Sequence, residues 1–175
     1  GGVEVPFSNK AELEKQMPGL KKKFLYARDF AKASMAQIFD QSKLNQSRVL
    51  TADFFSNAIL LNEGNMVFTL KPLPAKAQFS SVRSVGLTDY NDDGLMDLLL
   101  GGNFYGTSVS MGRNDADFGT LLVNKGNGQL EARGIPGLVI KNEIRKIRSV
   151  KLGEQTAWII ARNNDSTLMI RIQGK

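Results

Sequence analysis

The chain has 175 residues, of which 42% are hydrophobic, and a formal net charge of +6. This length fits one domain, or one domain with an appendage, and the hydrophobic content argues against disorder. The chain contains no cysteine and no histidine. Disulfides, cysteine- or histidine-based catalysis and the usual zinc ligands are therefore excluded, and oxygen-bound hard cations such as calcium are the natural metal partners.

The N-terminal part of the chain favours short helices. Ser8 is placed to cap a first helix, Glu12 lies near the capping-box position, and Pro18 interrupts the helix. Ser34 is the candidate cap of a last short helical turn. We therefore predict a helical lead-in or insertion over residues 1–45.

From about residue 46 onward, short β-rich runs alternate with Asn-Gly and Gly-Asn turns, and some runs recur. The segment Val82–Leu87 (VRSVGL) returns as Ile147–Leu152 (IRSVKL). The segment Leu98–Asn103 (LLLGGN) returns as Trp158–Asn163 (WIIARN). The two segments lie closer together in the second copy, which lacks five residues at the place where the first copy carries an acidic loop.

A second pair of segments aligns independently. Leu60–Leu73 matches Leu122–Ile135, and both carry Asn-x-Gly-Asn where a hairpin must turn. A repeated unit of roughly 60 residues with about four strands is typical of propeller blades. The alternative is an ordinary β-sandwich with coincidental similarity.

The predicted fold is mainly β: a partial β-propeller of about two to three four-stranded antiparallel blades, with an N-terminal α-helical segment. The β region would span 46–175, with blades over 46–74 (partial), 80–136 (complete) and 144–173 (partial). A propeller usually needs about four blades to close. We therefore expect the chain to be a C-terminal piece of a longer protein that supplies the remaining blades. Otherwise, an oligomer supplies them or the helical segment covers the edges.

The acidic segment Asp89–Asp97 reads D-x-N-x-D-G-x-x-D. In a chain that curls around an ion, alternate side chains point inward, and glycine at position six allows the sharp reversal. An EF-hand would need glutamate at position twelve, which is Leu100 here, and helices where the flanking segments favour strands. A metal-free Asn/Asp/Gly turn is the alternative. The predicted calcium ligands are the side chains of Asp89, Asn91, Asp93 and Asp97 and the carbonyl of Leu95.

The run DYNDDGLMDLLLGGN, followed by the LLVNKGNG hairpin, resembles the FG-GAP / VCBS repeats of bacterial surface proteins and integrin-like propellers. With GGNFYG, MGRNDADFGTLL and the helical lead-in, the chain looks like the C-terminal portion of large bacterial FG-GAP/ASPIC-type proteins. The resemblance implies calcium at the same five loop positions and none in the third unit, where Gly153-Glu154-Gln155 replaces the loop. It also implies an extracellular or cell-surface location, with the periplasm and outer membrane as alternatives.

The resemblance implies a recognition or scaffold role towards a protein or glycan partner, not an enzyme. One alternative is a glycan-active enzyme fragment that uses a glycine-rich loop as its ligand-binding site. The residues of this loop are Asn103, Tyr105, Arg113, Asp115 and Asp117. Another alternative is binding of anionic glycans, or less favourably nucleic acid, by a basic cluster. That cluster contains Lys141, Arg145, Lys146, Arg148 and Lys151. No apolar run approaches the roughly 20 residues of a membrane span, so no membrane span is expected.

Overall fold

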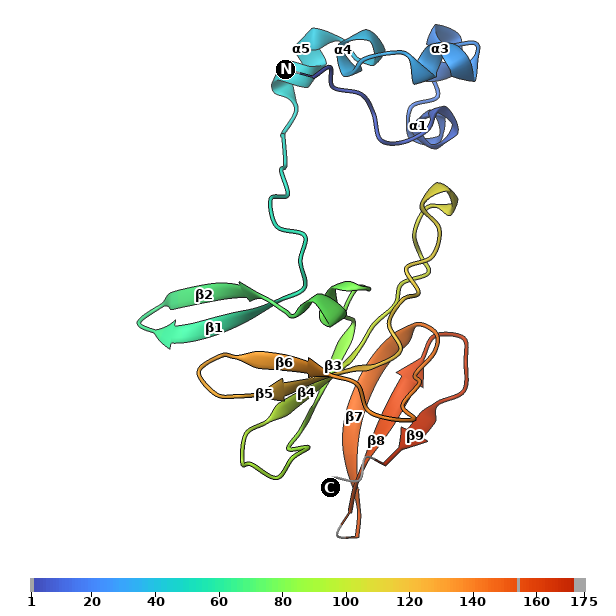
Figure 1. Ribbon diagram of the computed structural model, residues 1–175. Coiled ribbons are helices and arrows are strands. Elements are labelled where there is room, and N and C mark those ends of the chain that lie inside the picture. Colours follow the sequence, from blue (N-terminus) through green and yellow to red (C-terminus); the bar gives the residue numbers. More distant parts are fainter. Residues whose placement is uncertain (1, 154, 172–175) are drawn as a thin grey trace. The chain divides into compact units, whose positions relative to one another are not determined.

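The structure of the protein is a computed structural model that describes residues 2–153 and 155–171. The chain divides into two compact units, Gly1–Asp53 and Phe54–Lys175. In the described residues, every α-helix lies in the first unit and every β-strand lies in the second (Figure 1). We call these parts the helical unit and the sheet unit.

The helical unit consists of short helices whose ends are set by capping side chains. The Asn9 side chain accepts a hydrogen bond from the Glu12 amide at 3.0 Å, and the Glu12 carboxylate accepts one from the Asn9 amide at 3.2 Å. The prediction that Ser8 is the cap is therefore wrong by one residue, because only Asn9 stands three positions before Glu12 as a capping box requires. Ser34 caps α4 as predicted, but α4 is not the last helical segment, because α5 follows it. The helices are α1 (Lys10–Gln16), α2 (Leu20–Lys23), α3 (Ala27–Ala31), α4 (Met35–Ile38) and α5 (Gln41–Gln46).

The core of the helical unit is small. Its buried side chains are Leu20, Phe30, Ala33 and Ile38. Phe24 packs edge-on against Phe30, with ring centroids 5.6 Å apart and an interplanar angle of 89°. Edge-to-face packing of this kind adds about 1 kcal/mol to the free energy gained from burial.

The sheet unit contains three antiparallel sheets, which confirms the prediction of a mainly β fold behind a helical N-terminal segment. The two-stranded sheet contains β1 (Ala58–Gly64) and β2 (Val67–Pro72). The four-stranded sheet contains β3 (Ser84–Thr88), β4 (Asp97–Gly101), β5 (Thr120–Asn124) and β6 (Leu130–Arg133), in that order. The three-stranded sheet contains β7 (Ile144–Leu152), β8 (Gln155–Arg162) and β9 (Leu168–Ile170). Two 3-10 helices, η1 (Ala75–Gln78) and η2 (Val109–Met111), lie in the connections.

The hairpins β1–β2 and β5–β6 have the same strand register. Leu60 pairs with Leu70 in the first hairpin, and Leu122 pairs with Ala132 in the second. The alignment of the two sequence segments makes Leu60 equivalent to Leu122 and Leu70 equivalent to Ala132, so sequence and pairing agree. The tips also agree, because in each hairpin the first asparagine of Asn-x-Gly-Asn accepts a hydrogen bond from the glycine amide at 2.9 Å.

The hairpins β3–β4 and β7–β8, by contrast, have different registers. Ser84 pairs with Gly101, so the sequence alignment would pair Ser149 with Ala161. Instead, Ser149 pairs with Trp158, and Ala161 pairs with Lys146. The acidic loop separates the end of β3 from the start of β4. By contrast, the pairing of β7 and β8 continues up to the short connection between them. Glu154, part of the turn for which no ion is predicted, lies outside the described residues.

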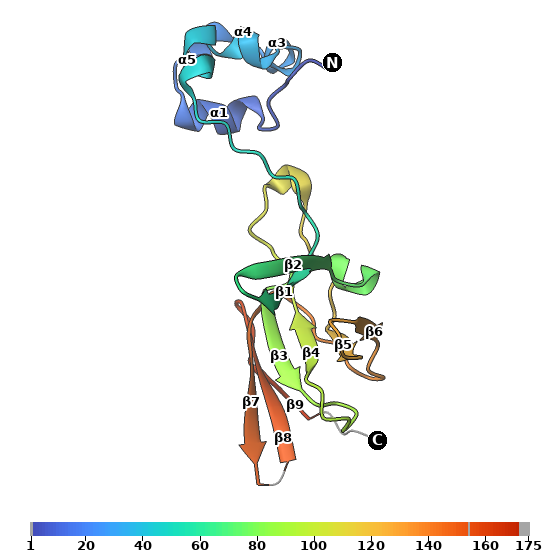
Figure 2. The ribbon, with the colours of Figure 1, turned by 90° about the vertical axis from the view of Figure 1, so that its left-hand side faces the viewer.

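The main core lies between the four-stranded and three-stranded sheets. β3 and β7 run alongside each other (Figure 1 and Figure 2), and the Ile147 amide donates a hydrogen bond to the buried Ser84 hydroxyl at 2.9 Å. Leu99, Ile147 and Trp158 are at most 2% exposed. Gly86 lies where a Cβ would stand only 2.6 Å from the Trp158 ring, so glycine allows the two sheets to approach closely. This packing fixes the strands that carry the acidic loop.

Candidate functional site

The acidic loop connects β3 to β4, so the predicted strand flanks are present. Asp89 directly follows β3, and Asp97 is the first residue of β4. Gly94 has a φ of 83°, a left-handed conformation that a Cβ would strain. The chain therefore reverses at position six of the loop, where the spacing placed the turn.

Hydrogen bonds to carboxylates hold the loop in shape. Asp89 Oδ1 accepts from the Asp93 amide at 3.1 Å, and Asp89 Oδ2 accepts from the Gly94 amide at 2.9 Å. Asp93 accepts from the Leu95 amide at 2.8 Å and from Asn91 Nδ2 at 2.7 Å. These two hydrogen bonds lower the pKa of the Asp93 carboxyl, because they favour its ionised form. The loop therefore presents the Asp93 side chain as an ionised carboxylate at neutral pH.

Asp97 is the buried anchor of the site. It is 0% exposed, yet its carboxylate is satisfied: Oδ2 accepts from the Tyr90 amide at 2.8 Å and Oδ1 accepts from the Asn124 amide at 2.7 Å. The Asn124 side chain in turn donates to the Met96 carbonyl at 3.2 Å. One carboxylate thus joins the start of the acidic loop to the end of β5.

The residues of the loop fit a hard cation by their chemistry, because they offer only carboxylate, carboxamide and carbonyl oxygens near one turn. Each carboxylate oxygen that accepts one N–H retains a second lone pair. Asn91 donates its amide nitrogen toward Asp93, so it must rotate to present its oxygen. Across residues 2–153 and 155–171, no three acidic, histidine or cysteine side chains converge as a metal-binding group. The loop is held in this conformation by its own hydrogen bonds.

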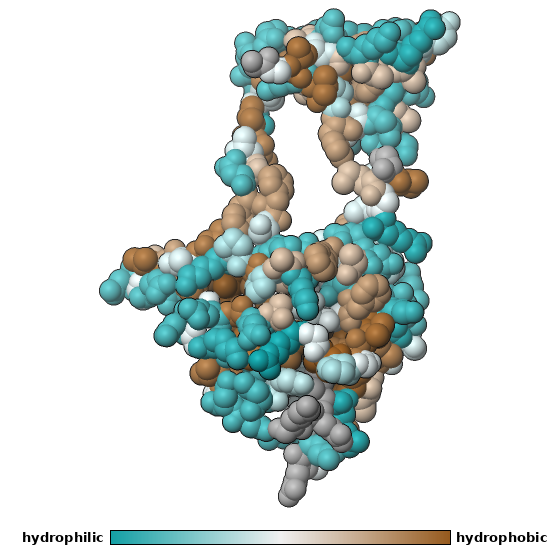
Figure 3. All heavy atoms as spheres, viewed as in Figure 1, coloured by the Kyte–Doolittle hydropathy of each residue, from teal (hydrophilic) through white to brown (hydrophobic). Residues whose placement is uncertain are grey.

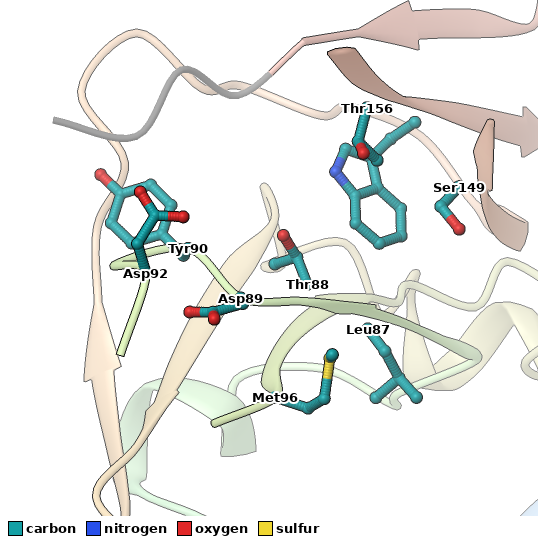
Figure 4. Close-up of a pocket in the computed structure, with 9 residues that line it drawn as sticks. Leu87, Thr88, Asp89, Tyr90, Asp92, Met96, Ser149 and Thr156 are labelled. Carbon is teal, nitrogen blue, oxygen red and sulfur yellow. The ribbon is translucent and has the colours of Figure 1, made fainter. Parts of the chain in front are cut away.

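A pocket of about 380 Å³ lies beside the acidic loop (Figure 4). Thr88 and Asp89 line it from β3 and the loop, whereas Ser149 and Thr156 line it from β7 and β8 (Figure 4). Trp158 closes the apolar side of the pocket and is 2% exposed. The lining of the pocket therefore includes two carboxylates, several hydroxyl groups and two aromatic rings.

The predicted ligand-binding loop is the long connection between β4 and β5, which projects away from the sheets (Figure 1). Tyr105 donates its hydroxyl to Asp115 Oδ1 at 2.6 Å, and the Arg113 guanidinium lies 4.9 Å from the centre of the Tyr105 ring. Desolvation, together with the nearby Asp115 carboxylate, raises the pKa of the Tyr105 phenol to about 12. The structure therefore brings these three residues together.

The other two residues of this predicted site lie at the base of the loop. Asn103 is 0% exposed, and its side chain donates to the carbonyls of Asp117 and Asn142 and accepts from the Asp117 amide. Asp117 is half-buried, and desolvation raises the pKa of its carboxyl, although the Gly119 amide hydrogen bond opposes this shift. Asn103 is occupied in shaping the loop, so it does not present its amide to a ligand.

The basic cluster lies mostly on β7. Lys146 and Arg148 lie on one face of the strand and Lys151 on the opposite face, because side chains alternate along a strand. Arg145 lies 3.2 Å from Glu143 Oε1, and Glu143 is only 1% exposed. This contact has ion-pair distance without hydrogen-bond alignment, and it balances a buried carboxylate. The positive charges of the cluster therefore do not form one continuous face.

Sequence reasoning missed two parts of the site. The Asn-x-Gly-Asn motif predicts only a hairpin tip at Asn124, and nothing in the motif shows that the Asn124 amide binds Asp97. Trp158 and Thr156 line the pocket beside the loop although they belong to β8, in the last sheet of the chain. The packing of two sheets brings them there, and no local sequence signal reports it.

Comparisons of the chain with models of known protein families, with curated proteins and with solved structures found no match. No helix within residues 2–153 or 155–171 has both the length and the apolar character needed to span a membrane.

Proposed function

We propose that the sheet unit is a calcium-binding repeat module of the FG-GAP / VCBS type, from an exported or cell-surface bacterial protein. In this proposal the three sheets are propeller blades, and the remaining blades come from a longer chain or an oligomer. The module acts in recognition or as a scaffold for a protein or glycan partner rather than as an enzyme.

The acidic loop is the observation that carries this proposal. Its oxygen-bearing side chains recur at alternate positions, it reverses at Gly94, and it closes on the buried Asp97 between two paired strands. Such an arrangement places several negative groups near one turn, and their mutual repulsion falls when a cation lies among them. A turn that served only to connect β3 and β4 would not need this charge.

Each residue of the loop has a role that follows from its position. Asp89, Asn91 and Asp93 would hold the ion through side-chain oxygens, and Leu95 would contribute its carbonyl. Asp97 would complete the set from the start of β4 while it retains its hydrogen bonds to the Tyr90 and Asn124 amides. The ion would supply positive charge that offsets the mutual repulsion of these carboxylates.

Two further observations support the blade assignment. The hairpins β1–β2 and β5–β6 share strand register and tip geometry, as expected if both are the outer half of a repeated sheet. The four-stranded and three-stranded sheets pack face to face, as neighbouring blades do. The projecting loop with Tyr105, Arg113 and Asp115 then provides an exposed surface for a partner.

The test is a comparison of thermal unfolding with calcium and with excess chelator. We expect calcium to raise the melting temperature, because a ligand at about 100 times its dissociation constant stabilises the folded state by about 2.7 kcal/mol. Asp93→Asn should reduce this calcium-dependent shift, since it removes one charge from the predicted ligand set. Asp92→Asn is the matched control, because Asp92 lies outside that set and is exposed.

Calcium affinity is measured in parallel by isothermal titration calorimetry. Equal melting temperatures with calcium and with chelator, together with no binding heat, would disprove the calcium part of the proposal. Equal losses in Asp93→Asn and Asp92→Asn would instead indicate nonspecific attraction of cations by the acidic loop.

A further inference from the structure

Strand β1 is an edge strand, although its counterpart β5 lies in the interior of a sheet. β5 pairs with β6 on one side and with β4 on the other. β1 pairs with β2 on one side, and no strand among the described residues pairs with its other side. Since the hairpins β1–β2 and β5–β6 share their register, β1 lacks the neighbour that β4 provides to β5.

Side chains of β1 are more exposed than the equivalent side chains of β5, which has a neighbouring strand on both sides. Leu122 in β5 is 0% exposed, whereas its equivalent in β1, Leu60, is 59% exposed. Val123 is likewise 0% exposed, whereas its equivalent Leu61 is only half-buried. The space-filling view shows apolar surface on the β1–β2 hairpin (Figure 3). β1 therefore carries side chains typical of a buried strand on an uncovered edge.

The backbone of β1 also has groups free to pair on this side. The Asn57 carbonyl accepts the Leu73 amide on the β2 side, so alternation directs the amides of Leu60 and Asn62 to the opposite side. In the equivalent hairpin, the Asn124 amide faces β4 and donates to the carboxylate of Asp97. The Asn62 amide is therefore positioned to donate a hydrogen bond to an aspartate at the start of an added strand, as the Asn124 amide does to Asp97.

An apolar groove also lies between the two-stranded sheet and the four-stranded sheet. It has a volume of about 320 Å³ and lies between β1 on one side and β3 and β4 on the other. Its lining includes Ile59, Val85 and Leu98. A strand added to β1 would extend the contact that the two-stranded sheet already makes with its neighbour.

We propose that the free edge of β1 binds one antiparallel strand of a partner polypeptide, and that this strand begins with aspartate and continues with aliphatic residues, as β4 does. Backbone pairing along an exposed edge provides the affinity, and the side chains that alternate along the strand provide the selectivity. The inference deepens the repeat-module proposal, but it does not depend on calcium.

Disulfide tethering tests the proposal, because the chain contains no cysteine. The full chain receives Leu60→Cys, and the probe is a synthetic peptide of residues Met96–Gly102 in which cysteine replaces Leu98. Leu98 pairs with Leu122, the equivalent of Leu60, and the paired Cα atoms of antiparallel strands lie within disulfide reach. The peptide lacks Asp89, Asn91 and Asp93, so a failed calcium titration and a failed tethering experiment remain distinguishable.

In a thiol-exchange buffer we expect at least about tenfold more mixed disulfide with this peptide than with a scrambled peptide of the same composition. Replacing the peptide aspartate with alanine should lower the yield. Leu152→Cys is the matched control variant, since Leu152 is 50% exposed and lies on β7. Hydrogen exchange of the Leu60→Cys adduct should show new protection at Asn62.

Three results would overturn the proposal. Equal yields with the matched and scrambled peptides would show that the edge does not select a strand. Protection of the β1 amides in the unmodified full chain without peptide would show that another segment of the chain already covers this edge. A dimer of the unmodified chain that Leu60→Glu abolishes would identify a second copy, and not a partner strand, as the occupant.

Discussion

Tyr105 and Asp115 link two distant points of the same loop by a single short hydrogen bond. The phenol hydroxyl donates to Asp115 Oδ1 at 2.6 Å, and the Arg113 guanidinium lies over the ring. The hydroxyl can donate only while it is protonated, so the bond favours the neutral phenol. The hydrogen bond that links these two points of the loop therefore requires the Tyr105 phenol to be protonated, and the phenol stays protonated well above neutral pH.

We predict that Tyr105 titrates at about pH 12, above the ordinary value of 10.0. Between these values the unfolded chain loses the proton while the folded chain retains it. Tyr105 therefore contributes stability that is complete below about pH 10 and is lost as the pH rises through about 12. Ultraviolet difference titration of the native chain against Tyr105→Phe isolates this phenol.

Asp115→Asn should lower the pKa of Tyr105 toward 10.0, because it removes the charged acceptor of the hydrogen bond. An unchanged titration curve in Asp115→Asn would show that desolvation alone sets the pKa of the phenol.

At the scale of elements, the close packing of two sheets depends on a glycine in β3. A Cβ on Gly86 would lie 2.6 Å from the Trp158 ring and 2.7 Å from Ile147 Cγ2. Both neighbours belong to the buried core, so neither can move without disturbing other contacts. The four-stranded and three-stranded sheets can therefore approach this closely only where β3 has no side chain.

We predict that Gly86→Ala lowers the free energy of unfolding by about 1–3 kcal/mol, the usual cost of overpacking a core. Gly134→Ala is the matched control, because its Cβ would meet nothing within 4 Å, and it should change stability by less than about 1 kcal/mol. Urea titration followed by tryptophan fluorescence measures both variants. Equal midpoints for the two variants would contradict the close approach of the sheets at Gly86.

The elements also show which features the sequence could predict. Strands flanking the acidic loop and Asn-Gly hairpin tips are local signals, and β3, β4 and both tips lie where these signals indicate. The register of β7 and β8 is not a local property, because it depends on how a shorter connection closes. The pocket wall at Trp158 and the buried role of Asn103 likewise arise from contacts between distant segments.

At the scale of the whole molecule, the chain is two separately packed units joined by an exposed segment. Residues 47–56 are all exposed, and Val49 and Leu50 are each 77% exposed. The helical unit buries few large side chains, whereas the sheet unit has an extensive core. Small cores provide little free energy of folding, so the helical unit should be the less stable of the two.

We predict that limited trypsin digestion cuts first after Arg48, since proteases attack exposed connecting segments. The helical unit should then be degraded, while a fragment beginning at Val49 and containing the sheet unit persists. Mass spectrometry of timed samples identifies the products. Early cleavage within the β7–β8 hairpin, or loss of both units at the same rate, would contradict this division of stability.

The two hydrogen bonds of Asp97 have a mechanical consequence for the sheet unit. The Asp97 carboxylate accepts hydrogen bonds from both the Tyr90 amide and the Asn124 amide. It therefore cannot move unless both segments move with it or one of the two hydrogen bonds breaks. Asn124 also sets the turn of the β5–β6 hairpin through the Gly126 amide. A displacement of Asp97 is therefore passed on to Asn124, and through Asn124 to the turn of the β5–β6 hairpin.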